Sequence, residues 1–561
     1  MARPAAELAD MTAAETTGGP GAPGGPPGPA TPAAGADLRS FARGGVLSLI
    51  GAAVSTFANV GLVVLITRGF SKAEAGVFFA ATSVFLLALA TAQLGTQTGL
   101  VYFISRFRVL DQRHRIGQAI AAALTPVGVV GLLLGACLFV FAGPLAQVFV
   151  AGPPGHFATY LRVLAVCLPL AVFAEPLLAA TRGFRTQRPT VLIENIGRPL
   201  TQVVLTIIVI VTASTPWLGL AWALPYLPAA LLAWLWLGHL HHPAEAPVRT
   251  RAWWPPRKKN DLPVRTGTFW SGRGPAEKRA ADGMKGEFWR YTWPQTFTVI
   301  AQIALQRAGI VLVAALSGPA QAAVFTAATR FLVVGQLANS SLGTTLQPQL
   351  GEKLALGDRA AARTLFETAT AWLVLIAWPL YLLCAVFATP MMAAFGRGYE
   401  DGTDAILVLT GAMLVASASG MVNMVLSMAG RTSWNLVTTV LSLAANLSLN
   451  IILIPHLGVL GAAIAWAAAI LINNVVPLAL IVWSLRIHPY GAATLVAAGL
   501  AGLCFGVLPF VGRAAVGDGF ATLAAFATFG ALLYAGGCWR FRGPLRLGTL
   551  RALRSPARRS N

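Results

Sequence analysis

The feature that most constrains this chain is a long series of apolar windows separated by short polar segments. A helix needs about 20 mostly apolar residues to cross the hydrocarbon core of a bilayer. Only 11% of the 561 residues are charged, whereas a soluble domain carries roughly 25%. The chain is therefore predicted to be an all-α polytopic membrane protein. Fourteen windows are long enough to span, near 44–67, 76–103, 118–142, 158–180, 191–213, 217–239, 289–316, 320–346, 364–388, 404–428, 432–454, 459–484, 490–511 and 518–538.

The distribution of lysine and arginine predicts the orientation of these windows. If the N-terminus is cytoplasmic, the segments that face inward hold 33 of the 41 lysines and arginines when Arg290, at the inner edge of window 289–316, is counted with them, and four more lie inside windows. The outward segments hold only Arg68, Lys72, Arg397 and Arg513. This bias follows the positive-inside rule, so both termini are expected in the cytoplasm. Topology thus explains the net charge of +21, and nucleic acid is not expected as a partner.

Three segments outside the windows have distinct compositions. Residues 1–43 are rich in Pro, Gly and Ala, so a disordered cytoplasmic tail is expected there. Residues 241–288 are basic and form the largest inward segment, and 541–561 form a second basic tail. The 241–288 segment is interpreted as a cytoplasmic linker that either contacts anionic lipid or is a solvated charged loop.

Motifs for metal binding and catalysis are sparse. His239, His241 and His242 lie close together, but nothing nearby supplies further ligands, so neither a metal nor a cofactor is expected. The sequence contains no HExxH, GxSxG or phosphate-binding loop in a suitable context. The five cysteines show no CxxC spacing and are interpreted as apolar residues of the windows. The chain is therefore predicted not to be an enzyme.

Internal repetition predicts two related halves. Three short stretches of the first half recur in the second at offsets of 244 to 248 residues: 77–82 with 324–329, 94–96 with 342–344, and 220–223 with 464–467. Because an even number of windows separates the copies, both halves have the same orientation, as in two-lobed transporters with a central site. The expected plan is an N-lobe (44–240), a C-lobe (289–485) and two extra helices (486–540).

Two arginines are predicted to lie deep in the bilayer. The hairpin between their helices is near Gly318, and a rise of 1.5 Å per residue puts Arg307 and Arg330 roughly 16–18 Å from it. Neither window contains an acidic residue. Charges at that depth are costly and commonly functional. Since guanidinium grips phosphate in bidentate fashion, both are candidate contacts for a phosphate-bearing substrate. Capping of carbonyls and a pair with Glu175 across the lobes are the alternatives.

The repeat relates these arginines to polar residues of the first half. At the same offset, Asn59 corresponds to Arg307 and Ser83 corresponds to Arg330. The two lobes are thus expected to share a frame and to differ in charge. Asn59 is therefore a candidate substrate-binding residue together with the arginines.

The remaining candidates are amides and acids inside the windows. Gln302 and Gln306 lie one turn apart beside the first arginine and are interpreted as cavity lining or as helix-packing contacts. Glu194 and Arg198 are spaced i, i+4 with the acid first, the favourable order for an ion pair on a helix. Glu175 is another acid within a window and a candidate coupling group.

Several motifs resemble a known superfamily. Residues 446–455 (NLSLNIILIP) and 458–465 (GVLGAAIA) are similar to the N-lllN-liLIP-yGi-GAAiAt stretch of polysaccharide exporters. Residues 69–81 resemble the first hairpin of these proteins, 347–350 their eighth helix, and 395–399 their outer FG-gy loop. The order and spacing of the motifs resemble the multidrug/oligosaccharidyl-lipid/polysaccharide (MATE-like) exporter superfamily. The two terminal helices fit its fourteen-helix members.

The resemblance implies a flippase of the bacterial cytoplasmic (inner) membrane. It would translocate a lipid-diphosphate-linked oligosaccharide by alternating access of the two lobes, for cell-surface polysaccharide assembly. Polysaccharide polymerase or export machinery would be a further partner. One departure concerns coupling: many members carry an acid in the seventh helix, roughly where Gly309 stands here.

Two rival functions belong to other classes. A cation-coupled multidrug antiporter shares the implied fold, but it should use acidic groups for a cationic drug, and Glu175 is the candidate within a window. A non-transporting structural subunit of a polysaccharide assembly complex would also be polytopic. Loss of export on replacement of Arg307, with normal insertion, would distinguish the transporter from that subunit.

Overall fold

The computed structural model describes residues 32–110, 112, 114–151, 155–184, 186–241 and 275–546. Most of the predicted N-terminal tail (1–43), most of the basic linker (241–288) with His242, and residues 547–561 of the second tail lie outside the described residues. The chain divides into two compact units, Met1–Val46 and Leu47–Asn561. Every contact discussed below lies within the second unit.

The described residues form helices and short connections, with no strand among them. In chain order the α-helices are α1 (Pro32–Gly69), α2 (Lys72–Gln93), α3 (Thr96–Val109), α4 (His114–Val140), α5 (Ala142–Phe149), α6 (Phe157–Gly183), α7 (Arg198–Val211), α8 (Leu218–Ala223), α9 (Tyr226–His241), α10 (Pro275–Ser317), α11 (Pro319–Ala355), α12 (Arg359–Val386), α13 (Ala388–Ala393), α14 (Thr403–Ser419), α15 (Val422–Met428), α16 (Thr432–Leu485), α17 (Ala492–Ala501), α18 (Leu508–Val516) and α19 (Phe520–Arg540). Shorter turns are the π-helices η1 (Thr190–Gly197) and η4 (Gly502–Val507) and the 3-10 helices η2 (Thr215–Trp217) and η3 (Tyr399–Gly402).

The structure confirms an all-helical, multi-pass membrane protein. Within the described residues, 12 helical stretches are long and apolar enough to cross a bilayer. Two features separate this number from the expected fourteen. The α16 stretch counts once, although Gly458 (φ 55°, ψ −126°) interrupts its helical geometry. The α11 helix is not among the 12, because Arg330 and several amide and hydroxyl side chains interrupt its apolar run. The count of fourteen therefore stays a prediction.

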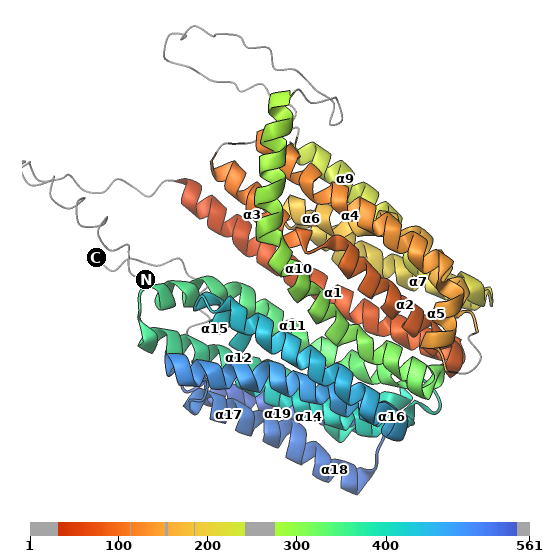
Figure 1. The fold of residues 1–561 in the computed structure, drawn as a ribbon. Helices are drawn as coiled ribbons and strands as arrows, with labels where there is room; N and C mark the ends of the chain where they lie inside the picture. The colour runs from red at the N-terminus through yellow and green to blue at the C-terminus, as the bar shows by residue number, and fades with distance from the viewer. Residues whose placement is uncertain are drawn as a thin grey trace, which may run out of the picture. The chain divides into compact units, whose positions relative to one another are not determined.

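The helices pack in two groups that follow the chain order (Figure 1). In the first group, α6 packs against α2, α3, α4 and α9, whereas in the second α16 packs against α10 and α14, and α12 against α11, α14 and α17. The α2 helix also packs on α10 and α11, so it joins the groups. Its Phe78 and Phe85 are fully buried and make edge contacts with Tyr160 and Trp222. Burial of these large rings supplies much of the packing along α2.

The long helix α10 contacts both groups. Its C-terminal part packs on α11 and α16, whereas its N-terminal part packs on α3 and α4. Met284 and Phe288, one turn apart, are fully buried there in a cluster with Phe103 and Phe107. Further along, the Thr296 hydroxyl donates a 2.7 Å hydrogen bond to a carbonyl at the end of α2. The first helix of the predicted C-lobe therefore lies partly against the N-lobe.

One end of the helix bundle is closed by contacts between the two groups. We call it the closed end and define it by Arg68, Lys72 and Gly398. The Arg68 Nε donates to the Ala394 carbonyl at 2.7 Å. The Lys72 ammonium donates to the Gly398 carbonyl and lies 3.6 Å from the Asp401 carboxylate. These contacts join the start of α2 to the loop before η3.

Candidate functional site

The two deep arginines meet in one small cavity between α1, α2, α10 and α11. We call it the arginine cavity. Its volume is about 60 Å³, which is room for a few water molecules, since a water needs about 10–15 Å³ of such space. Arg307 comes from α10 and Arg330 from α11. The other lining residues are Asn59, Leu62, Val63, Ile66, Phe78, Phe79, Thr82, Ser83, Leu86, Trp222, Ile310 and Thr326.

The charge in this cavity is unbalanced. The lining set contains two arginines and no acid. The Arg330 guanidinium donates to the Thr326 carbonyl and to the Thr329 hydroxyl, both at 3.2 Å. Arg307 has no hydrogen-bond or ion-pair partner within the described part of the chain. A guanidinium held away from water without a counter-ion is costly, so this geometry suits an anionic ligand.

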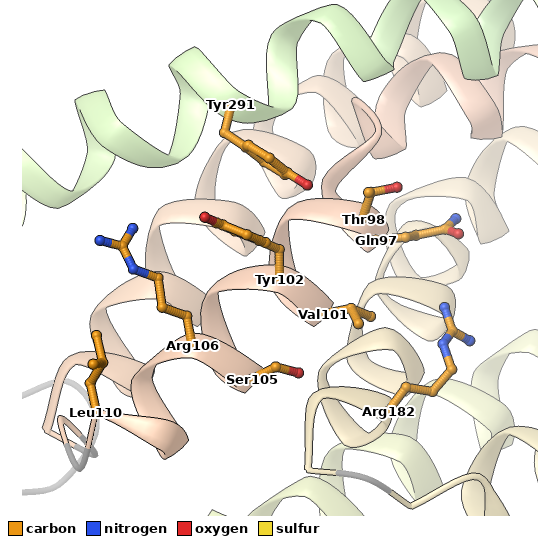
Figure 2. A pocket seen from close by; sticks show the side chains of 9 residues that line it. All are labelled: Gln97, Thr98, Val101, Tyr102, Ser105, Arg106, Leu110, Arg182 and Tyr291. Atoms are coloured by element: carbon orange, nitrogen blue, oxygen red, sulfur yellow. The ribbon is translucent and has the colours of Figure 1, made fainter. Parts of the chain in front are cut away.

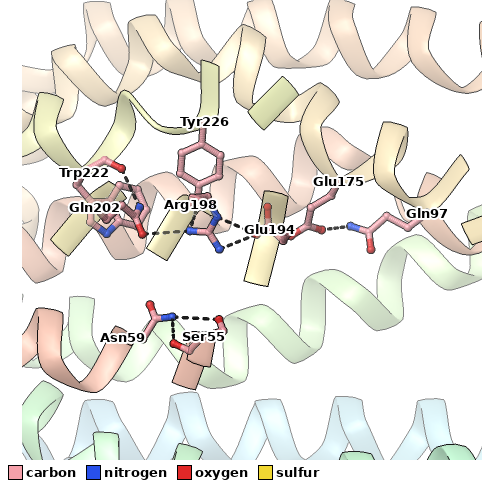
Figure 3. A network of polar contacts seen from close by, with 9 residues as sticks. All are labelled: Ser55, Asn59, Gln97, Glu175, Glu194, Arg198, Gln202, Trp222 and Tyr226. Atoms are coloured by element: carbon pink, nitrogen blue, oxygen red, sulfur yellow. Dashed lines mark hydrogen bonds and ion pairs between the residues drawn. The ribbon is translucent and has the colours of Figure 1, made fainter. Parts of the chain in front are cut away.

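The repeat relation between the halves is visible in the same cavity. Asn59 and Ser83 line it together with the two arginines to which the sequence offset relates them. The Asn59 amide nitrogen donates to the carbonyl of Ser55, one turn earlier on α1, at 2.7 Å (Figure 3). Two equivalent helix pairs thus face each other, one neutral and one cationic.

The two glutamines beside Arg307 lie elsewhere. Gln302 and Gln306 are both exposed, and neither lines the arginine cavity. Their spacing of four residues puts them on one face of α10, while Arg307, one residue further on, points about 100° away. The structure therefore does not bring these amides to the same site as the arginines.

A second polar group lies inside the first helix group (Figure 3). The Arg198 guanidinium lies 2.6 Å from the Glu194 carboxylate, so the pair that the spacing predicts is formed. It also donates to Gln202 and to the Tyr226 hydroxyl, both at 3.4 Å, and lies 4.9 Å from the ring of Tyr226. The Gln202 amide in turn donates to the Trp222 carbonyl at 2.8 Å. Sequence spacing predicted the ion pair, and the fold added its partners.

Glu175 joins this group from α6. Its carboxylate accepts a hydrogen bond from the Gln97 amide. The second carboxylate oxygen of Glu194 is buried and has no hydrogen-bond partner among the described residues. Arg307 does not pair with Glu175, so the pair across the lobes considered from the sequence is absent from this structure. Two acids thus lie close together inside one helix group, balanced by Arg198.

A much larger cavity, whose lining residues Figure 2 shows, lies beside α3 and the N-terminal part of α10, toward the end of the bundle away from the start of α2 (Figure 1). We call it the wide cavity. Its volume is about 1050 Å³, and it lies between α3, α6 and the N-terminal part of α10. The residues that line it are Gln97, Thr98, Val101, Tyr102, Ser105, Arg106, Leu110, Arg182 and Tyr291. The sequence analysis did not predict this site, because it explained its arginines, which lie in inward-facing segments, by the positive-inside rule alone. The one available signal was a tyrosine one turn before an arginine on the same helix.

Comparisons with known proteins identify the fold. No family model matches the chain. Over 152 residues it is 23% identical to the probable low-salt glycan biosynthesis flippase Agl15 of Haloferax volcanii, across 27% of this chain and 32% of that protein. The solved structure of lipid II flippase MurJ in an inward closed conformation superposes with a TM-score of 0.66 at 12% identity, covering 89% of this chain and 99% of that one. An inward-facing multidrug resistance MATE family transporter of the MOP superfamily gives 0.59 at 16% identity, over 77% and 94%.

These likenesses confirm the fold that the motifs implied. The chain has the polytopic helical fold that MurJ and the MATE transporters share. The matched stretch spans about a third of Agl15, and at 12% and 16% identity the likeness to the solved structures lies in the fold. These similar proteins are flippases and transporters rather than enzymes.

Proposed function

We propose that this protein is a flippase that translocates a lipid-diphosphate-linked oligosaccharide across a membrane by alternating access. The observation that carries the proposal is the arginine cavity, where Arg307 and Arg330 converge without an acid. A diphosphate supplies the missing negative charge, and planar guanidinium groups bind phosphate oxygens in pairs. The glycan flippase and lipid II flippase similarities support this substrate class.

The membrane and orientation belong to the same proposal. The charge bias of the connecting segments supports an orientation with both termini in the cytoplasm. The resemblance of the motifs to polysaccharide exporters is the reason to propose a bacterial cytoplasmic membrane. The closed end, with Lys72, then faces outward, and the wide cavity faces the cytoplasm. Glycan loaded from the cytoplasmic side would be delivered to the outer leaflet for cell-surface polysaccharide assembly. Anionic lipid at the 241–288 segment and a polysaccharide polymerase or exporter are the proposed partners.

The two lobes are proposed as the moving parts. The arginine cavity lies between elements of both lobes and is too small here for a sugar diphosphate. A substrate can occupy it only after the helices around it separate. Glu175 and Glu194 are the proposed coupling groups, because they lie close together and one carboxylate oxygen of Glu194 has no partner among the described residues.

A cation-coupled multidrug antiporter is the second candidate. The buried acids Glu175 and Glu194 favour it, since a cationic drug needs negative charge. However, Arg198 already neutralises Glu194, and Gln97 holds Glu175. The arginine cavity, which contains no acid among its lining residues, would repel a cation. The balance of charge therefore favours an anionic substrate.

The test is translocation of a lipid-linked oligosaccharide in proteoliposomes at matched protein amounts. Each contact from a guanidinium to phosphate is worth about 1.5–3 kcal/mol, so Arg307→Ala and Arg330→Ala should each slow flipping by about 10- to 150-fold. The Lys variants should lie in between, because an ammonium keeps the charge without the bidentate geometry. Arg162→Ala is the matched control, since Arg162 is exposed on α6. Unchanged flipping in both alanine variants would refute the assigned substrate contact.

A further inference from the structure

The two cavities differ in what they can hold in this conformation. The arginine cavity has about 60 Å³ and the wide cavity about 1050 Å³. Sites for small molecules usually measure about 300–1000 Å³. Of these two cavities, only the wide cavity therefore has room for a phosphate-bearing headgroup with attached sugars. The question is whether the wide cavity has the chemistry to bind one.

Its charged groups are suited to an anion. Arg182 stands one residue before the end of α6 and has no ion-pair partner within the described residues. Arg106 on α3 lies 2.9 Å from Glu287, which also forms an ion pair with Arg115 at 3.6 Å. Two buried acids, Glu175 and Glu194, lie near enough to attract Arg182 electrostatically, but each already has a closer partner, Gln97 for Glu175 and Arg198 for Glu194. Arg182 is thus the guanidinium available to a ligand, while Arg106 is already shared with a carboxylate.

The same cavity carries an aromatic surface. Tyr102 on α3 and Tyr291 on α10 stack with ring centroids 4.4 Å apart and an interplanar angle of 14°. Both rings remain 42% and 38% exposed, respectively, and Figure 2 shows them on the side of the cavity opposite Arg182. Exposed tyrosine rings offer an apolar face for sugar C–H groups and a hydroxyl for sugar oxygens. A basic group and an aromatic surface on opposite walls fit a ligand with a phosphate and a sugar.

We propose that the wide cavity is the loading site for the diphosphate headgroup of the lipid-linked glycan, with Arg182 as its phosphate contact and the Tyr102–Tyr291 pair as its sugar contact. This inference rests on the proposed function. The headgroup binds there in the conformation described here and reaches Arg307 and Arg330 only after the arginine cavity opens. Two basic sites thus serve successive stages of one passage.

The groups between the two cavities fit such a passage. Gln97 lines the wide cavity and also contacts Glu175, the first member of the buried polar group. Arg198 of that group donates to Tyr226. The Tyr226 ring lies against that of Trp222, with centroids 5.6 Å apart, and Trp222 lines the arginine cavity. Polar and aromatic side chains therefore continue from the wide cavity to the arginine cavity.

The test is photocrosslinking of purified protein in nanodiscs, with a photoreactive residue at Val101, which lines the wide cavity. The probe is radiolabelled polyprenyl diphosphate. Arg182→Gln should lower the labelled fraction at limiting probe about tenfold, because it removes a charge-assisted phosphate contact. Arg188→Gln, an exposed arginine outside the cavity, is the control and should label like the parent. A second variant, Thr98→Glu, puts a negative charge on an exposed lining residue, where misfolding is not expected. It should also lower the labelled fraction, compared with the neutral variant Thr98→Gln.

Two further arms separate this proposal from the proposed function. The Arg307→Ala/Arg330→Ala double variant should still label at Val101 while losing translocation. If labelling persists in Arg182→Gln and in Thr98→Glu, the loading site is refuted, whatever translocation shows. Excess phosphatidylglycerol should leave the label unchanged. If it removes the label, the cavity binds ordinary anionic phospholipid, and the loading role is refuted.

Discussion

The contact between α2 and α11 at Gly76 offers a sharp way to perturb the balance between conformations. A Cβ atom added at Gly76 would lie 1.6 Å from the carbonyl oxygen of Pro319. Because the obstructing atom belongs to the backbone, no side-chain rotation can relieve the overlap. Ordinary van der Waals contact begins at about 3.4 Å, so Gly76→Ala requires the two helices to separate by nearly 2 Å.

The expected magnitude follows from two opposing effects. Overpacking of a close contact costs about 1–3 kcal/mol. Alanine instead of glycine within a helix recovers about 0.5–1 kcal/mol, but it does so equally in every conformation. The cost falls on the conformation in which α2 and α11 touch near the closed end. A loss of about 1–3 kcal/mol there should raise the population open at this end by about 5- to 150-fold.

The assay measures access to the arginine cavity from the side of Lys72. A single reporter cysteine, Ser83→Cys, is placed in a variant that lacks the five native cysteines. Ser83 lines the cavity and is 1% exposed, so a membrane-impermeant maleimide should react slowly with the parent. Gly76→Ala should speed labelling by the factor given above. Gly61→Ala is the matched control, because a Cβ at Gly61 meets nothing within 4 Å.

Equal labelling rates in the Gly76→Ala and Gly61→Ala variants, with both proteins folded, would refute the reasoning. That result would mean that α2 and α11 already separate freely at this point, or that their contact does not control access. A matching change in flipping is not needed for this test, because it measures the conformation alone.

Three other perturbations have defined outcomes. Lys72→Ala removes the ion pair with Asp401 and a hydrogen bond between the lobes. Because exposed ion pairs contribute about 0–1 kcal/mol, the rate of Ser83→Cys labelling should rise less than fivefold. A labelling rate as high as that of Gly76→Ala would contradict this expectation. Glu194→Gln leaves Arg198 buried without its carboxylate and should lower the free energy of unfolding by about 3–5 kcal/mol, measured as a lower Tm in detergent. A Tm equal to that of the parent would show that this ion pair does not stabilise the fold. Thr296→Val removes the hydrogen bond that ties α10 to the end of α2 and should cost about 1 kcal/mol, measured by the same melting assay; a Tm equal to that of the parent would show that this bond does not stabilise the fold.

Part of this protein could be predicted from the sequence because the physics is local or repeated. Apolar windows long enough to span a bilayer specify a polytopic helical protein, whatever their neighbours are. The pair of Glu194 and Arg198 needs only one turn of helix to form. The repeat offset relates Asn59 and Ser83 to the two deep arginines, and all four residues line one cavity.

Other features depended on contacts between distant segments. Periodicity does not show which face of a membrane helix contacts protein, since apolar residues occur on all its faces. The sequence therefore could not show that Gln302 lies outside the cavity that Arg307 lines. Arg182, Tyr102 and Tyr291 come from three helices, and only their packing turns three ordinary residues into the walls of the wide cavity. Side-chain type and helix period can be read from the sequence. The packing of α10 on α3, by contrast, depends on the burial of Phe288 and its neighbours between helices that are distant in the sequence.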